Sequence, residues 1–131
     1  MRRRVVVTGM GVIAPNAYGV EEFEKALREG RSGIRFIQEM KDLNFSCQVG
    51  GIPQGVDKVL MEYFDEEERN SINDNIGYAA IASMDAWKDA GFTVPKHDSG
   101  QVDWATGAII GSGIGGMDTI GKIVVPMVND G

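Results

Sequence analysis

Two glycine-rich runs in this sequence have a residue spacing that is typical of a binding site. One is Gly111-Ser112-Gly113-Ile114-Gly115-Gly116, directly after the apolar run 104–110, and the other begins Gly9-Met10-Gly11, directly after Val5–Thr8. Both fit the pattern G-x-G-x-x-(G or A), whose glycines let backbone amides meet a pyrophosphate at a helix N-terminus. The chemistry that this pattern offers is dinucleotide binding. The structural alternative is a tight turn at the exit of each strand.

The sequence around both runs argues against dinucleotide binding. Pro15, Asn16 and Gly19 follow the first run, where a binding helix should already have begun. Glu29 stands at about the right distance for a ribose-binding acid, but it falls within a predicted helix and not at a strand end. A helix is predicted after the second run, yet the sequence ends before an acid could follow. We therefore expect both runs to be strand-exit turns, and we expect no cofactor.

Few other side chains suit catalysis or metal binding. The sequence has one cysteine, Cys47, and one histidine, His97, which excludes an internal disulfide and a structural zinc site. No base or helix N-terminus near Cys47 would activate it as a nucleophile, so we expect a packed or edge-strand cysteine. His97 is expected in a solvated loop. The acidic run 65–68 suits a helix start better than a cation site, because contiguous carboxylates point in different directions.

The elements that must position these residues are strands alternating with helices. Continuous apolar, β-branched segments predict buried strands over 3–11 and 104–110, and weak alternation predicts an edge strand over 45–49 that Gly50-Gly51 ends. Apolar residues at helical spacing predict helices over 20–29, ended by Gly30, and over 56–64. A longer helix is expected from Asp65 to a C-cap at Gly91, and another after Gly116, with a turn over 129–131. The long helix carries small residues that should let it pack very close to another element: Gly77, Ala79, Ala80, Ala82 and Ser83.

Composition places the chain among soluble globular proteins. Its 131 residues, 43% hydrophobic and 24% charged, are enough for one domain with a core. The net charge of −6 argues against a nucleic-acid surface, and no apolar run approaches the length of a membrane span. Thr8, Gly9 and Gly11 interrupt the apolar segment after Arg2-Arg3-Arg4, so we expect no signal peptide and a cytoplasmic protein. Because three strands make a poor sheet, we expect these residues to form part of a larger domain.

Four segments, in order and in register, resemble one protein family. They are Arg3–Ile13, Leu27–Ile34, Ala79–Phe92 and Gly107–Gly116. On these segments the chain resembles the β-ketoacyl-acyl carrier protein synthases of types I and II. It departs from their usual pattern in the first loop, Ala14–Gly19. It also departs before the long helix, where the family usually has Met-Asp-Arg and this chain has Ile72-Asn73-Asp74-Asn75.

The resemblance implies a thiolase-like α/β fold, in which two similar halves form five layers (α/β/α/β/α), usually as a homodimer. Residues 1–131 would then be the N-terminal portion of the first half, ending before the family's nucleophilic cysteine. The family's two histidines would lie in the second half. Cys47 does not match the nucleophile position, so the resemblance implies no catalytic residue in this chain, which alone should be inactive.

The implied reaction is a decarboxylating Claisen condensation in fatty-acid or polyketide synthesis. An acyl group moves from acyl carrier protein to the cysteine thiolate, malonyl-carrier protein loses carbon dioxide, and the resulting carbanion attacks the thioester. By match to the family, Ile114 should lie beside the cysteine and gate the acyl pocket, and Met117 and Ile120 should line the pocket. Flexible methionine and branched isoleucine suit a fatty chain.

Two other functions stay open. A partner subunit that resembles a chain-length factor would keep the fold, lack the cysteine and form a heterodimer with a related subunit. A dinucleotide-binding domain would bind NAD or NADP.

Overall fold

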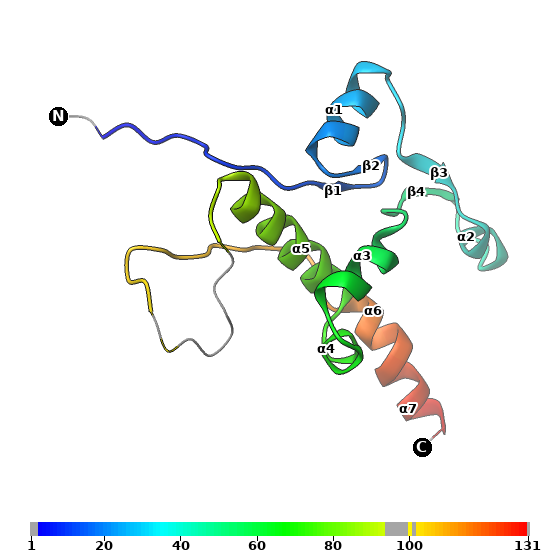
Figure 1. The fold of residues 1–131 in the computed structure, drawn as a ribbon. Coiled ribbons are helices and arrows are strands. Elements are labelled where there is room, and N and C mark those ends of the chain that lie inside the picture. The colour runs from blue at the N-terminus through cyan, green and yellow to red at the C-terminus, as the bar shows by residue number, and fades with distance from the viewer. Residues whose placement is uncertain (1–2, 94–99, 101, 131) are drawn as a thin grey trace.

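The computed structural model describes residues 3–93, 100 and 102–130. Within these residues the chain is a mixed α/β structure with two separate two-stranded sheets and a set of helices (Figure 1). The helix α5, Asp74–Asp89, is the longest element, and the remaining elements are arranged around it. No helix among the described residues is both long and apolar enough to cross a membrane.

The first sheet is a tight hairpin that leads into α1. Strands β1, Ile13–Ala14, and β2, Ala17–Tyr18, pair antiparallel across the turn Pro15-Asn16. Helix α1, Val20–Arg28, then begins with Glu21 and Glu22 at its positive end. Gly30 follows with a φ of 65°, a left-handed conformation that ends the helix. The helix predicted over 20–29 and its end at Gly30 are confirmed.

The second sheet places its strands at positions that differ from the expected edge strand. Strand β3, Ile34–Phe36, pairs antiparallel with β4, Val49–Gly51, and α2, Gln38–Asp42, lies between them in the chain. The prediction over 45–49 is wrong, because the two glycines expected to end the strand belong to it. A Cβ built at Gly50 would lie 2.8 Å from the Cδ1 of Ile37, and one at Gly51 would lie 2.9 Å from the Cγ of Pro15. Glycine inside a strand here marks a close approach by another element.

Helix α3, Val56–Tyr63, confirms the prediction over 56–64, but the single long helix expected from Asp65 to Gly91 is two helices. Helix α4, Glu66–Ser71, starts with a capping box between Asp65 and Glu68, so the acidic run does begin a helix. The chain then leaves helical geometry at Ile72, and the side chain of Asn73 accepts a hydrogen bond from the amide of Ile76 to start α5. The end of α5 at a left-handed Gly91 is as predicted.

The buried strands predicted over 3–11 and 104–110 are not found. Residues 3–11 and 106–110 run past α5 without regular secondary structure, Trp104 and Ala105 form a turn, and neither segment has a strand partner among the described residues (Figure 1). Val5 is 94% exposed and Trp104 is 92% exposed. A strand needs a neighbouring strand to pair with its backbone N–H and C=O groups. Sequence periodicity does not identify which segment that neighbour is.

The last helical stretch begins where it was predicted. Helix α6, Met117–Thr119, continues through the π-helical turn η1, Ile120–Val124, into α7, Val125–Asp130. The turn expected over 129–131 is wrong for Asn129 and Asp130, which are helical, and Gly131 lies outside the described residues. The π-helical turn ends at Val124, two residues before Pro126, whose ring nitrogen has no N–H to donate.

The buried core of the described part is small. Val56 and Val59 of α3 and Ile81 of α5 form one cluster, and Ala26 of α1 is the other buried apolar residue. Leu60 closes the contact between α3 and α5, since a Cβ built at Gly77 would lie 2.7 Å from its Cδ2. This core fixes α3, α5 and the first hairpin relative to one another.

Candidate functional site

The first glycine run serves helix packing. A Cβ built at Gly9 would overlap the carbonyl oxygen of Ala86, and one built at Gly11 would overlap that of Ala82. Because glycines two residues apart share a face of an extended segment, both bring the backbone onto the same side of α5. The small residues of α5 do therefore permit the very close packing that was predicted.

The amide between these glycines is already paired with a carboxylate. The backbone N–H of Met10 donates to the Oδ2 of Asp89 at 2.8 Å. A pyrophosphate cradle needs such amides to be directed at the ligand, and the carboxylate of Asp89 would repel a phosphate there. The geometry of this run is therefore that of a packing contact and not of a phosphate-binding loop.

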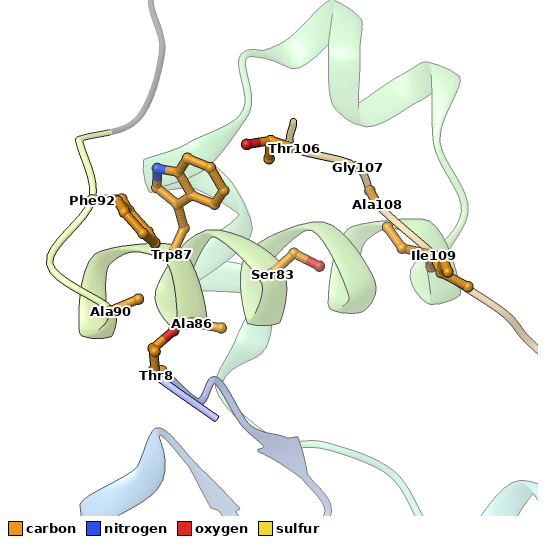
Figure 2. A pocket seen from close by; sticks show the side chains of 12 residues that line it. Thr8, Ser83, Ala86, Trp87, Ala90, Phe92, Thr106, Gly107, Ala108 and Ile109 are labelled. Carbon is orange, nitrogen blue, oxygen red and sulfur yellow. The ribbon is translucent and has the colours of Figure 1, made fainter. Parts of the chain in front are cut away.

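A cavity of about 550 Å³ lies on α5 between the segment that carries Thr8 and Gly9 and the segment 106–110 (Figure 2). Trp87 and Phe92 line one end, with ring centroids 4.9 Å apart, and the indole N–H of Trp87 donates to the carbonyl of Thr93 at 2.9 Å. The polar side chains that line it are hydroxyls, on Thr8, Ser83 and Thr106. Among the described residues, no titratable side chain lines this cavity, and its largely apolar walls can accommodate apolar groups.

The second glycine run lies across the start of α5. The side-chain amide of Asn75 donates to the carbonyl oxygen of Ile114 at 3.0 Å, and the hydroxyl of Ser112 donates to the same oxygen at 3.0 Å. The backbone N–H of Asp74 donates to the Oδ2 of Asp118 at 3.1 Å. Gly116 has a φ of 75°, which turns the chain into α6. Together, these contacts place the turn that leads into α6 against the first turn of α5.

A smaller cavity separates this turn from the body of α5. It has a volume of about 330 Å³, with Ile76 and Ala79 of α5 on one side and Ile110 and Ser112 on the other. Asn73 and Asn75 lie at its rim on the α5 side. The turn therefore meets α5 through polar contacts around a hollow and not through a packed apolar interface.

The three residues predicted to form the acyl pocket lie on one continuous stretch, but the described residues do not enclose them. Ile114 is 74% exposed, Met117 is 62% exposed and Ile120 is 45% exposed. Met117 and Ile120 are three residues apart in helical geometry, so they share a face. None of the three lines the 330 Å³ cavity. Their role as a pocket wall stays a prediction.

A polar cluster that sequence analysis did not find joins three elements. The hydroxyls of Tyr18 and Tyr63 donate to the two carboxylate oxygens of Asp85 at 2.9 Å and 2.7 Å. Lys88 donates to the hydroxyl of Tyr63 at 2.7 Å, and its Nζ lies 4.4 Å from the centre of that ring. Burial and then the hydrogen bond to Asp85 raise the pKa of Tyr18, and the bond to Tyr63 raises the pKa of Lys88. This cluster connects the first hairpin to α3 and α5.

The other candidate reactive residues form no site. Cys47 is exposed and lies before β4, so the expectation of a packed or edge-strand cysteine is wrong; its thiol donates to the carbonyl of Val49 at 3.6 Å. His97 lies outside the described residues. Within the part that the structure describes, no three His, Cys, Asp or Glu side chains are grouped so that they could hold a metal ion.

Comparison with known proteins gives one consistent result. The family model "Beta-ketoacyl synthase, N-terminal domain" matches residues 2–127. The chain is 38% identical over 119 residues to 3-oxoacyl-[acyl-carrier-protein] synthase 2 of Vibrio harveyi, a match that covers 91% of this chain and 27% of that protein. It is 31% identical over 121 residues to the protein of the same name from Coxiella burnetii, covering 92% of this chain and 28% of that protein. The chain thus spans about a quarter of the length of these curated relatives.

Proposed function

We propose that this chain, which belongs to the β-ketoacyl synthase family, is the N-terminal part of a condensing enzyme. The enzyme would join an acyl thioester to malonyl-acyl carrier protein with loss of carbon dioxide. The observation that carries the proposal is the family match over residues 2–127, together with relatives named as 3-oxoacyl-acyl carrier protein synthases. The substrate class follows from what those names say the relatives act on.

In this proposal the chain supplies scaffold and pocket wall, while catalysis belongs to residues outside it. Ile114 gates the acyl pocket, and Met117 and Ile120 line it from one helical face. Their exposure supports this role, because an apolar face left open by this chain is available to a fatty acyl chain or to apolar side chains from elsewhere in the enzyme. We assign no catalytic role to Cys47, which is exposed and has no base hydrogen-bonded to its thiol.

We further propose that segment 3–11 and residues 106–110 of the predicted strand 104–110 are strands of a thiolase-like, five-layered α/β/α/β/α fold. Both pass α5 and expose apolar side chains such as Val5 and Ile109, as strands do where no neighbouring strand covers them. We also propose that the enzyme is a cytoplasmic homodimer that acts on acyl carrier protein.

The test is an assay of the enzyme that contains these residues, with acyl-carrier protein and ¹⁴C-carboxyl-labelled malonyl-carrier protein. We expect release of labelled carbon dioxide and formation of a 3-oxoacyl product. If neither forms with any acyl chain, the proposal fails. If both form only after a related subunit is added, the chain belongs instead to a non-catalytic partner that resembles a chain-length factor.

A further inference from the structure

The turn formed by residues 111–116 has few packing contacts of its own. A Cβ built at Gly111 or at Gly113 would meet no atom within 4 Å, and the side chain of Ile114 is mostly exposed. The 330 Å³ cavity lies between the turn and the apolar side of α5. Since glycine also restricts the backbone least, packing does not determine where this turn sits.

Hydrogen bonds from the start of α5 hold the turn instead. Asn75 reaches across to the carbonyl of Ile114, and Asp118, just after the turn, accepts from the backbone of Asp74. The bond from Ser112 to Ile114 lies within the turn, so it shapes the turn without attaching it to α5. Of these three bonds, the one from Asn75 is the side-chain bond that ties Ile114 itself to the helix.

We propose that Asn75 is a positioning residue that fixes Ile114 and thereby sets which acyl chain lengths the pocket accepts. This inference rests on the proposed function, because it assumes that Ile114 gates an acyl pocket. The hollow beneath the turn, which Ser112 and Gly115 line, gives the turn that carries Ile114 room to move once the tether is lost.

The test compares Asn75→Asp with the wild-type enzyme and with Asn70→Asp. Aspartate keeps the size of asparagine but removes the donor, and it places a negative charge beside the carbonyl of Ile114. Asn70 lies exposed on α4, in a different helix from Asn75, so its substitution makes the same charge change without removing the bond to Ile114. Asn75→Gln retains a donor on a longer side chain and should restore most of the wild-type behaviour.

Two readouts separate positioning from a general structural role. Loss of one hydrogen bond should raise the hydrogen-exchange rate of the peptide that contains residues 111–116 by about threefold to tenfold in Asn75→Asp. The ratio of kcat/KM for long-chain over short-chain acyl donors should rise at least about threefold, mainly through KM, because Ile114 then moves aside more easily. A merely structural defect would lower kcat for every chain length equally.

Each result of these two measurements decides a different part of the proposal. Unchanged exchange in Asn75→Asp, or an equal change in Asn70→Asp, overturns the tether. Faster exchange with an unchanged chain-length ratio overturns the link between the tether and selectivity. If the wild-type enzyme condenses no acyl donor, the proposed function fails and the selectivity claim with it, while the exchange measurement still decides whether Asn75 positions the turn.

Discussion

Gly9 and Gly11 fit a phosphate-binding pattern, yet the structure uses them to bring a backbone segment against α5. Their missing side chains leave room for the carbonyl oxygens of Ala82 and Ala86, and the amide of Met10 is bonded to Asp89. The sequence alone could identify the glycines as positions where a side chain is not tolerated, and the small residues of the helix as a packing surface. It could not join the two, because about 70 residues separate them and no local rule specifies which segments meet.

Replacement of Gly11 with alanine should therefore be costly. The added Cβ would press on the backbone of α5 at Ala82, so the helix or the segment must move, at a cost of about 1–3 kcal/mol or more. The measurement is the Tm of the enzyme that contains these residues. Gly113→Ala is the control, since a Cβ there meets nothing within 4 Å, and its effect should stay within about 0.5 kcal/mol. Equal effects of the two substitutions would contradict the packing role.

Tyr18 should give the protein a specific sensitivity to alkali. Burial and the hydrogen bond to Asp85 raise its pKa in the folded state, so the folded state holds this phenol proton more tightly than the unfolded state does. The resulting stability is complete below about pH 10, the ordinary tyrosine pKa, and is lost as the pH rises towards the pKa of the folded state. We expect the free energy of unfolding to fall less steeply above about pH 10 in Tyr18→Phe than in the wild type. Parallel curves for the two proteins would exclude this role of Tyr18.

At the scale of elements, local signals predicted helices well and strands poorly. The helices α1 and α3, the start of α4 at Asp65 and the end of α5 at Gly91 follow from apolar spacing and capping residues, which act within a few residues of one another. The strand β3 was missed, β4 was placed too early, and the two longest predicted strands have no partner in the described part of the chain. Strand pairing depends on distant segments, which a periodicity does not identify.

The break between α4 and α5 shows the same limit in a helix. The long helix predicted from Asp65 runs through Ile72 without a break, but the side chain of Asn73 makes a cap that begins a new helix. Asn73→Ala should remove the bond to the amide of Ile76 and cost about 1 kcal/mol of stability. Asn73→Ser keeps a capping oxygen and should recover most of that loss when the two are compared by denaturant unfolding of the enzyme. If serine is no better than alanine, Asn73 is not acting as a cap.

At the scale of the whole molecule, the described residues do not enclose the acyl pocket that the family resemblance predicts. The sequence correctly indicated the family, whereas the acyl pocket expected from Ile114 to Ile120 stays a prediction, because the described residues form no enclosed pocket around that segment. The contacts that hold the turn, from Asn75 and Asp118, were not predicted, because they join residues about 40 positions apart. A capping or turn pattern would have pointed only to Asn73 and Gly116.

The chain on its own should be poorly soluble or only partly ordered. The segments 3–11 and 104–110 expose apolar side chains and have no strand partner among the described residues, whose buried apolar core comprises Ala26, Val56, Val59 and Ile81. We expect concentration-dependent aggregation, or helical circular dichroism without a cooperative thermal transition, when residues 1–131 are expressed alone. A monomer with a sharp, reversible melt would contradict this expectation.

The contact between the first glycine run and α5 also limits how this part of the protein can change by mutation. Where two side chains clash, shortening one can compensate for lengthening the other. At Gly9 and Gly11 the nearest opposing atoms are main-chain carbonyl oxygens, which every amino acid carries. No second substitution at Ala82 or Ala86 can create room there, so suppressors of a Gly11 variant must act by shifting the helix as a whole or by adding stability elsewhere.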